Sequence, residues 1–161
     1  MLSALSVVVL YLGSFIEVLD ASMAVIASVM SIIAVIEFGR GAAWSIYAVT
    51  SVLSLILLPN KSVAVIYAAF FGFYPILKEV FEKKNKVIAW IFKEVTFNIA
   101  LVVCFAVLRF VIFIEAPSIP FAMYVIGALL LEGVFVLYDV ALTRLISLYI
   151  FKLRKRLRIG K

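Results

Sequence analysis

Six long apolar runs, separated by short polar segments, make up almost the whole chain. Their approximate bounds are residues 1–18, 22–38, 42–58, 62–80, 87–114 and 121–151. A helix that crosses the hydrocarbon core of a bilayer needs about 17–25 mainly apolar residues, and each run reaches that length. The pattern therefore predicts an all-α polytopic membrane protein, with six transmembrane helices in one domain over residues 1–161.

Glycine and proline mark the boundaries of these runs and one break inside them. Gly39 and Gly41 separate the second run from the third, and Pro59 closes the third. Pro75 lies inside the fourth run. Because proline lacks an N–H and its ring clashes with the preceding turn, we predict a kink at that point.

Charged residues give the predicted helices an orientation. The tail, residues 152–161, is strongly basic, and basic residues beside membrane helices mark the cytoplasmic side. Six crossings then place the N-terminus in the cytoplasm as well, together with Arg40 and the lysine-rich stretch 78–86. The outer side receives one basic residue, Lys61, and three acidic residues, Glu17, Asp20 and Glu115.

Composition strengthens the membrane prediction. Of the 161 residues, 67% are hydrophobic, whereas a soluble domain averages about 45–50%. We therefore expect a multi-pass protein whose first partner is the lipid bilayer, with anionic headgroups bound at the basic tail. The net charge of +6 lies directly beside the predicted helices, which argues against a nucleic-acid site.

Residues suited to catalysis or metal binding are sparse. The chain has no histidine and one cysteine, Cys104. That removes the commonest general base and metal ligand, and no phosphate loop or nucleophile motif occurs. Asp139 is the only aspartate inside a predicted span, so the paired aspartates of an intramembrane protease are missing. We expect neither an enzyme nor a bound metal or cofactor.

Small side chains recur at helical spacing on two of the runs. The second run carries Ala24, Ala27, Ser28, Ser31 and Ala34. The fourth run carries Ala64, Ala68 and Gly72 at positions i, i+4 and i+8. Because small residues let helices approach closely in lipid, we predict tight packing along both strips, and we predict that the second strip packs against a partner.

Polar side chains inside the last two runs form a predicted ladder. Charged residues are expensive in a membrane and normally pair. At about 1.5 Å per residue, two antiparallel helices would bring opposite groups to similar depths. The predicted rungs are Arg144 with Glu94, Asp139 with Lys93 or Asn98, and Glu132 with Arg109. We interpret the inner rungs as structural, because pairing would set the register of the two helices.

The outer rung is the stronger candidate for ligand binding. Glu132 and Arg109 would line any cavity that opens to the outside. Glu17, Asp20 and Asn60 would lie at the same outer rim. Together these five residues predict a site for a small molecule that the sequence does not name. The alternative interpretation is that the rim residues are ordinary solvated loop ends.

The chain resembles the substrate-binding S component of energy-coupling-factor vitamin transporters in size, number of spans and acidic outer rim. The segments 70–78 (FFGFYPILK) and 138–144 (YDVALTR), with Asn98, also resemble uncharacterised S-component-like bacterial membrane proteins. The resemblance implies a subunit of the bacterial cytoplasmic membrane that captures a vitamin-type solute from outside. A transmembrane coupling subunit and ATPases would be its partners. S components contact that subunit through small residues of the first span, which here are Ala4, Ser6, Gly13 and Ser14, without an A-x-x-x-A pattern.

Two other functions remain open. One is a non-transporting scaffold or assembly subunit, similar to the rod-shape protein MreD, that binds other membrane proteins. The other is a self-sufficient proton- or ion-coupled transporter, which the lack of histidine and of a visible inverted repeat disfavours. A cavity lined by Arg109 and Glu132 would favour solute capture, and a sealed apolar outer half would favour the scaffold.

Overall fold

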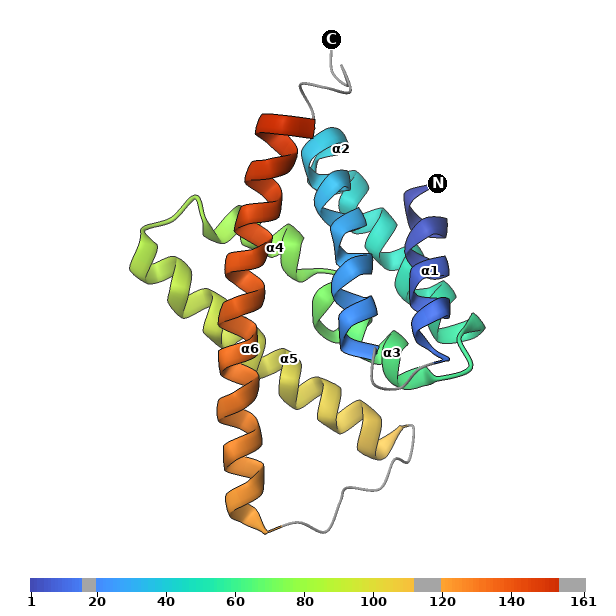
Figure 1. Cartoon of the computed structure of the whole chain (residues 1–161), viewed down its shortest axis with the longest axis vertical. Helices are drawn as coiled ribbons and strands as arrows, with labels where there is room; N and C mark the ends of the chain where they lie inside the picture. The colour runs from blue at the N-terminus through green and yellow to red at the C-terminus, as the bar shows by residue number, and fades with distance from the viewer. Residues whose placement is uncertain (16–19, 112–119, 154–161) are drawn as a thin grey trace. The chain divides into compact units, whose positions relative to one another are not determined.

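Helices account for all the regular structure in residues 1–15, 20–111 and 120–153, which the computed structural model describes (Figure 1). The all-α prediction is confirmed over these residues. The chain forms two compact units, Met1–Ile114 and Glu115–Lys161. The first contains α1 (Leu2–Gly13), α2 (Asp20–Leu57), α3 (Lys61–Ile66), the π-helix η2 (Tyr67–Phe71), α4 (Tyr74–Phe81) and α5 (Lys86–Phe110). The second contains α6 (Phe121–Leu148) and the π-helix η3 (Tyr149–Leu153).

The long element α2 is a helical hairpin. Gly39 has φ 81° and ψ 175°, a conformation open almost only to glycine, and the helix turns back there (Figure 1). A hydrogen bond of 3.2 Å from Asn60 Nδ2 to Asp20 Oδ2 joins the start of α2 to the chain just past its end. The turn predicted between the second and third runs is therefore confirmed, and α2 supplies two arms, 20–38 and 40–57.

Several of these helices are long enough to cross a membrane. Among the described residues, the helices with suitable length and composition are Asp20–Leu57, Lys61–Phe81, Lys86–Phe110 and Ala122–Phe151. This set is compatible with a membrane location. α1 has 12 residues and covers about 18 Å, which is less than the hydrocarbon core of about 30 Å. The ends of the predicted spans 1–18 and 87–114 lie partly outside the described residues.

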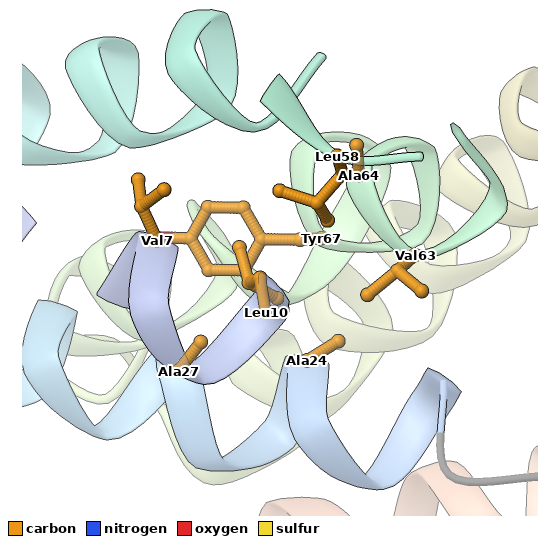
Figure 2. Packing of buried hydrophobic residues seen from close by; sticks show 8 residues of the cluster. All are labelled: Val7, Leu10, Ala24, Ala27, Leu58, Val63, Ala64 and Tyr67. Atoms are coloured by element: carbon orange, nitrogen blue, oxygen red, sulfur yellow. The ribbon is translucent and has the colours of Figure 1, made fainter. Parts of the chain in front are cut away.

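The core of the first unit forms around the Tyr67 ring, which has no exposed surface. Figure 2 shows side chains from α1, α2, α3 and the loop after α2 around it: Val7, Leu10, Ala24, Ala27, Leu58, Val63 and Ala64. The packing face predicted on the second run is confirmed, because its five members are all fully buried: Ala24, Ala27, Ser28, Ser31 and Ala34. These small side chains let α1 and the rest of the unit pack directly on the first arm of α2.

The fourth apolar run is a broken helix. α3 passes into the π-helix η2, and α4 begins two residues after Gly72. Pro75 lies in the first turn of α4, where no intrahelical donor is needed. A continuous helix would place the proline ring against the Phe71 carbonyl four residues earlier, so the interruption predicted at Pro75 is confirmed. The π-helix just before it was not predicted.

Candidate functional site

An open groove lies between η2 and α5, both in the first unit. Its volume is about 330 Å³, within the range of small-molecule pockets. Seven side chains line it, and all but Thr96 are apolar: Ala68, Ala69, Phe73, Thr96, Ile99, Ala100 and Val103. We call it the Ala68–Ala100 groove. The Thr96 hydroxyl already donates to the Phe92 carbonyl at 2.7 Å. The groove is therefore suited to an apolar occupant.

The π-helix forms one wall of this groove. The Gly72 N–H donates to the Tyr67 carbonyl at 2.8 Å, a bond between residues five apart. In an α-helix the same N–H would bond to the Ala68 carbonyl. Here the Ala68 carbonyl accepts a hydrogen bond of 2.8 Å from the Tyr47 hydroxyl on the second arm of α2. Because a buried backbone group without a partner is costly, the hydrogen bond from Tyr47 stabilises the widened turn.

A layer of buried hydroxyl groups lies behind the groove wall. The Tyr67 hydroxyl is 3.4 Å from Ser31 Oγ on the first arm of α2, and the buried Thr50 lies on the second arm. Ser31, Thr50 and Tyr67 have no exposed surface. Hydrogen bonds of this kind join helices within a membrane. The Ser31–Tyr67 contact ties the first arm of α2 to η2, and the Tyr47–Ala68 bond ties the second arm to it, so both hold the groove wall in place.

We expect Tyr47→Phe to lower the free energy of unfolding by about 1 kcal/mol, because the Ala68 carbonyl loses its side-chain donor. The measurement is reversible unfolding in mixed detergent micelles, followed by tryptophan fluorescence. Tyr11→Phe is the matched control, since the Tyr11 side chain is exposed on α1. An effect of Tyr47→Phe no larger than that of Tyr11→Phe would contradict the role of this hydrogen bond.

Two of the predicted ligand-binding residues meet at one end of the first unit. Asn60 donates from Nδ2 to Asp20, and its Oδ1 accepts the Ser62 N–H at 3.0 Å as the N-cap of α3. The Lys61 ammonium donates to the Leu58 carbonyl at 2.7 Å and the Ile56 carbonyl at 3.3 Å. These contacts close the end of the α2 hairpin, so the geometry gives Asn60 a structural role.

The remaining ligand-binding candidates are not gathered around that pair. Arg109 is exposed in the last turn of α5. Glu132 lies on α6 in the second unit, and its predicted pairing with Arg109 stays a prediction. Glu17 lies outside the described residues. In the core around Tyr67, Leu10, Leu58 and Val63 are at most 1% exposed, so this part of the first unit is closed and apolar.

The ladder residues of α5 divide between two faces of the helix. The Lys93 ammonium lies 3.2 Å from Glu82 Oε1 at the end of α4. Asn98 Nδ2 donates to the Glu94 carbonyl at 3.1 Å, within α5 itself. At about 100° per residue, Asn98 and Arg109 fall on nearly the same face of α5.

On α6 the same register puts Glu132 and Asp139 on one face and Arg144 about 140° away from Asp139. The rungs between α5 and α6 stay predictions.

The strip Ala64, Ala68 and Gly72 does not keep one face. Ala64 is in the core around Tyr67, and a side chain added at Gly72 would meet the Tyr47 and Tyr67 rings. Ala68, by contrast, lines the groove. The π turn between them rotates the later residues relative to the earlier ones. Packing of this strip against a partner stays a prediction, and Ala68 is the member best placed for it.

Sequence reasoning missed the groove and the hydroxyl layer. The recurrence of Thr50, Ser51 and Ser54 on one helix was a usable signal, since hydroxyl groups at that spacing share a face. In the described part of the chain, no group of three histidine, cysteine or acidic side chains is arranged to hold a metal ion. No family model, curated protein or solved structure matches this chain.

Proposed function

We propose that this chain is a membrane-embedded assembly subunit that binds a transmembrane helix of another membrane protein in the Ala68–Ala100 groove. The observation that supports the proposal is the groove itself, an open apolar hollow with small side chains in its walls. Small residues at helix interfaces allow close backbone approach, which is what drives helix association in lipid. This proposal is the scaffold function, the alternative to solute capture.

A helix fits this groove better than a polar solute does. The lining contains one hydroxyl, already bonded within α5, and no charged group that would hold a vitamin carboxylate or phosphate. Acyl chains of lipids adapt to any surface and need no small residues. A helix that presents its own small residues would bring van der Waals contacts along Ala68, Ala69 and Ala100.

The topology proposed for this subunit is six crossings with both termini in the cytoplasm, and the first crossing is the whole apolar run 1–18, since α1 alone has 12 residues. The two arms of α2 count as separate crossings, because 38 residues far exceed the length that one crossing needs. Arg40 Nε lies 3.5 Å from Glu79 Oε2, so the loops predicted to be cytoplasmic share one end of the first unit. Asp20 and Asn60, predicted to be outside, share the other end.

Ala69→Leu tests the proposal by filling the groove. A photo-crosslinking amino acid at Ile99, in the groove, should label one membrane protein in cells. Ala69→Leu should reduce that product at least about fivefold, because overpacking costs about 1–3 kcal/mol. Val102→Leu is the control, since Val102 is an exposed residue of α5 outside the groove. Labelling that persists in Ala69→Leu, or crosslinks to lipid alone, would count against a bound helix.

Solute capture in the manner of an S component is the competing proposal. The meeting of Asp20 and Asn60 at one end of the first unit supports it, although Asn60 already uses both groups of its amide. A vitamin that binds the folded chain raises its melting temperature through mass action. A screen of vitamins on the purified protein, with a search for copurifying ATPases, separates the two proposals.

A further inference from the structure

The turn between α4 and α5 carries more positive charge than its own carboxylates neutralise. Residues 78–86 contain four lysines and two glutamates. Each glutamate already faces two cations. Glu79 lies 2.6 Å from the Lys83 ammonium and 3.5 Å from the Arg40 guanidinium. Glu82 lies 2.9 Å from the Lys78 ammonium and 3.2 Å from the Lys93 ammonium.

Lys84 and Lys86 are left at the surface. Both side chains are exposed, and within the described residues neither makes an ion pair. The carboxylates beside them are shared between two cations each, so they cannot neutralise these lysines as well. The end of the first unit at this turn therefore presents a positive surface.

Tryptophan lies beside this positive surface. The chain has two tryptophans, Trp44 and Trp90, and both are partly exposed. Trp90 follows Lys86 by four residues on α5, so the two side chains are neighbours on one helix face. Trp44 follows Arg40 by four residues in the same way. Tryptophan next to basic residues is typical of the headgroup level of a membrane.

We infer that the α4–α5 turn binds an anionic phospholipid, whose headgroup is held by Lys84 and Lys86 beside Trp90. The apolar residues that follow on α5 are exposed, including Val87 at 67% and Ile91 at 57%. A phospholipid fits this arrangement because its phosphate would contact Lys84 and Lys86 while its acyl chains would cover the exposed apolar residues of α5. An acidic soluble protein would match only the charged part. This inference is independent of the groove and of the proposed function.

Trp90 provides the readout. Trp44→Phe leaves Trp90 as the only tryptophan in the full-length chain. The protein is reconstituted into phosphatidylcholine vesicles that contain an equal, low fraction of brominated phosphatidylglycerol or brominated phosphatidylcholine. Bromine quenches tryptophan on contact, so the ratio of the two quenching curves gives the relative binding constant. We expect brominated phosphatidylglycerol to quench Trp90 more strongly, and we expect added salt to reduce the difference.

Substitution of the lysines tests the assignment. Lys84→Gln and Lys86→Gln should each lower the preference for phosphatidylglycerol about fivefold. Arg109→Gln removes one positive charge at the other end of the same helix and should leave the preference unchanged. The double variant Lys84→Arg and Lys86→Arg keeps both positive charges and should keep the preference for phosphatidylglycerol. That result would exclude misfolding as the cause of the loss in the glutamine variants.

Three results would overturn the inference. They are equal quenching by both brominated lipids, a preference that survives loss of both lysines, and a preference that Arg109→Gln removes equally well. If an acidic peptide bound the lysines while the lipids showed no preference, the surface would belong to a protein partner and not to a lipid.

Discussion

Gly72→Ala is expected to lower the free energy of unfolding by about 1–3 kcal/mol, the usual cost of overpacking a filled core. A Cβ atom at Gly72 would lie 2.6 Å from Tyr47 Cδ2 and 2.8 Å from Tyr67 Cε1. Neither ring can move freely, because the Tyr47 hydroxyl is bonded to the Ala68 carbonyl and Tyr67 is fully buried. The substitution therefore loosens the groove wall together with the core.

The measurement is unfolding of the purified protein in mixed detergent micelles, followed by tryptophan fluorescence. Trp44 is a suitable reporter because its ring lies 5.6 Å from that of Tyr47. Gly41→Ala is the matched control, since a Cβ there meets nothing within 4 Å, and alanine normally stabilises a helix by about 0.5–1 kcal/mol relative to glycine. Equal stabilities for Gly72→Ala and the unmodified chain would show that the two rings do not enclose Gly72.

Gly39→Ala is expected to destabilise the α2 hairpin by about 1–3 kcal/mol through backbone strain alone. Gly39 has φ 81°, and a Cβ at this position meets no other atom within 4 Å. The cost therefore comes from the backbone conformation and not from a clash. Gly41, two residues later, lacks the positive φ and is again the control.

The expected result is a loss of stability for Gly39→Ala together with no loss for Gly41→Ala, in the same unfolding measurement. Because the turn brings Arg40 to Glu79, a weakened hairpin should also expose the α4–α5 end to proteolysis. If Gly39→Ala were as stable as Gly41→Ala, the hairpin would not depend on a left-handed turn residue.

The apolar pattern was sufficient for the helical class and for the positions of several helices. The predicted runs 22–38 and 42–58 correspond to the two arms of α2 around Gly39, and the run 87–114 corresponds to α5. These predictions succeeded because backbone groups in an apolar environment must bond within the segment. The buried strip on the first arm was also predictable, since small residues at helical spacing have few other uses.

The candidate ligand site could be predicted from the sequence only in part. Asp20 and Asn60 meet at one end of the first unit, while their position at an outer rim, which came from counting crossings, stays a prediction. The sequence did not predict that Asn60 caps α3 and also bonds to Asp20. These hydrogen bonds depend on the directions of side chains on two helices. The groove could not be predicted from the sequence, because it depends on a π turn. The residue pattern of this segment is the same as that of an ordinary α-helix.

The sequence by itself determined the helical class, the turn at Gly39 and the break at Pro75. It also determined the charge difference between the loops predicted to be cytoplasmic and those predicted to be outside. Each follows from local chemistry: hydrophobic length, glycine and proline geometry, and the cost of charge in lipid. The tertiary structure decided that η2 widens into a π turn, that Tyr47 bonds to Ala68, and that a groove opens beside α5. These features depend on side chains from helices far apart in the chain, and only their packing brings such groups within reach.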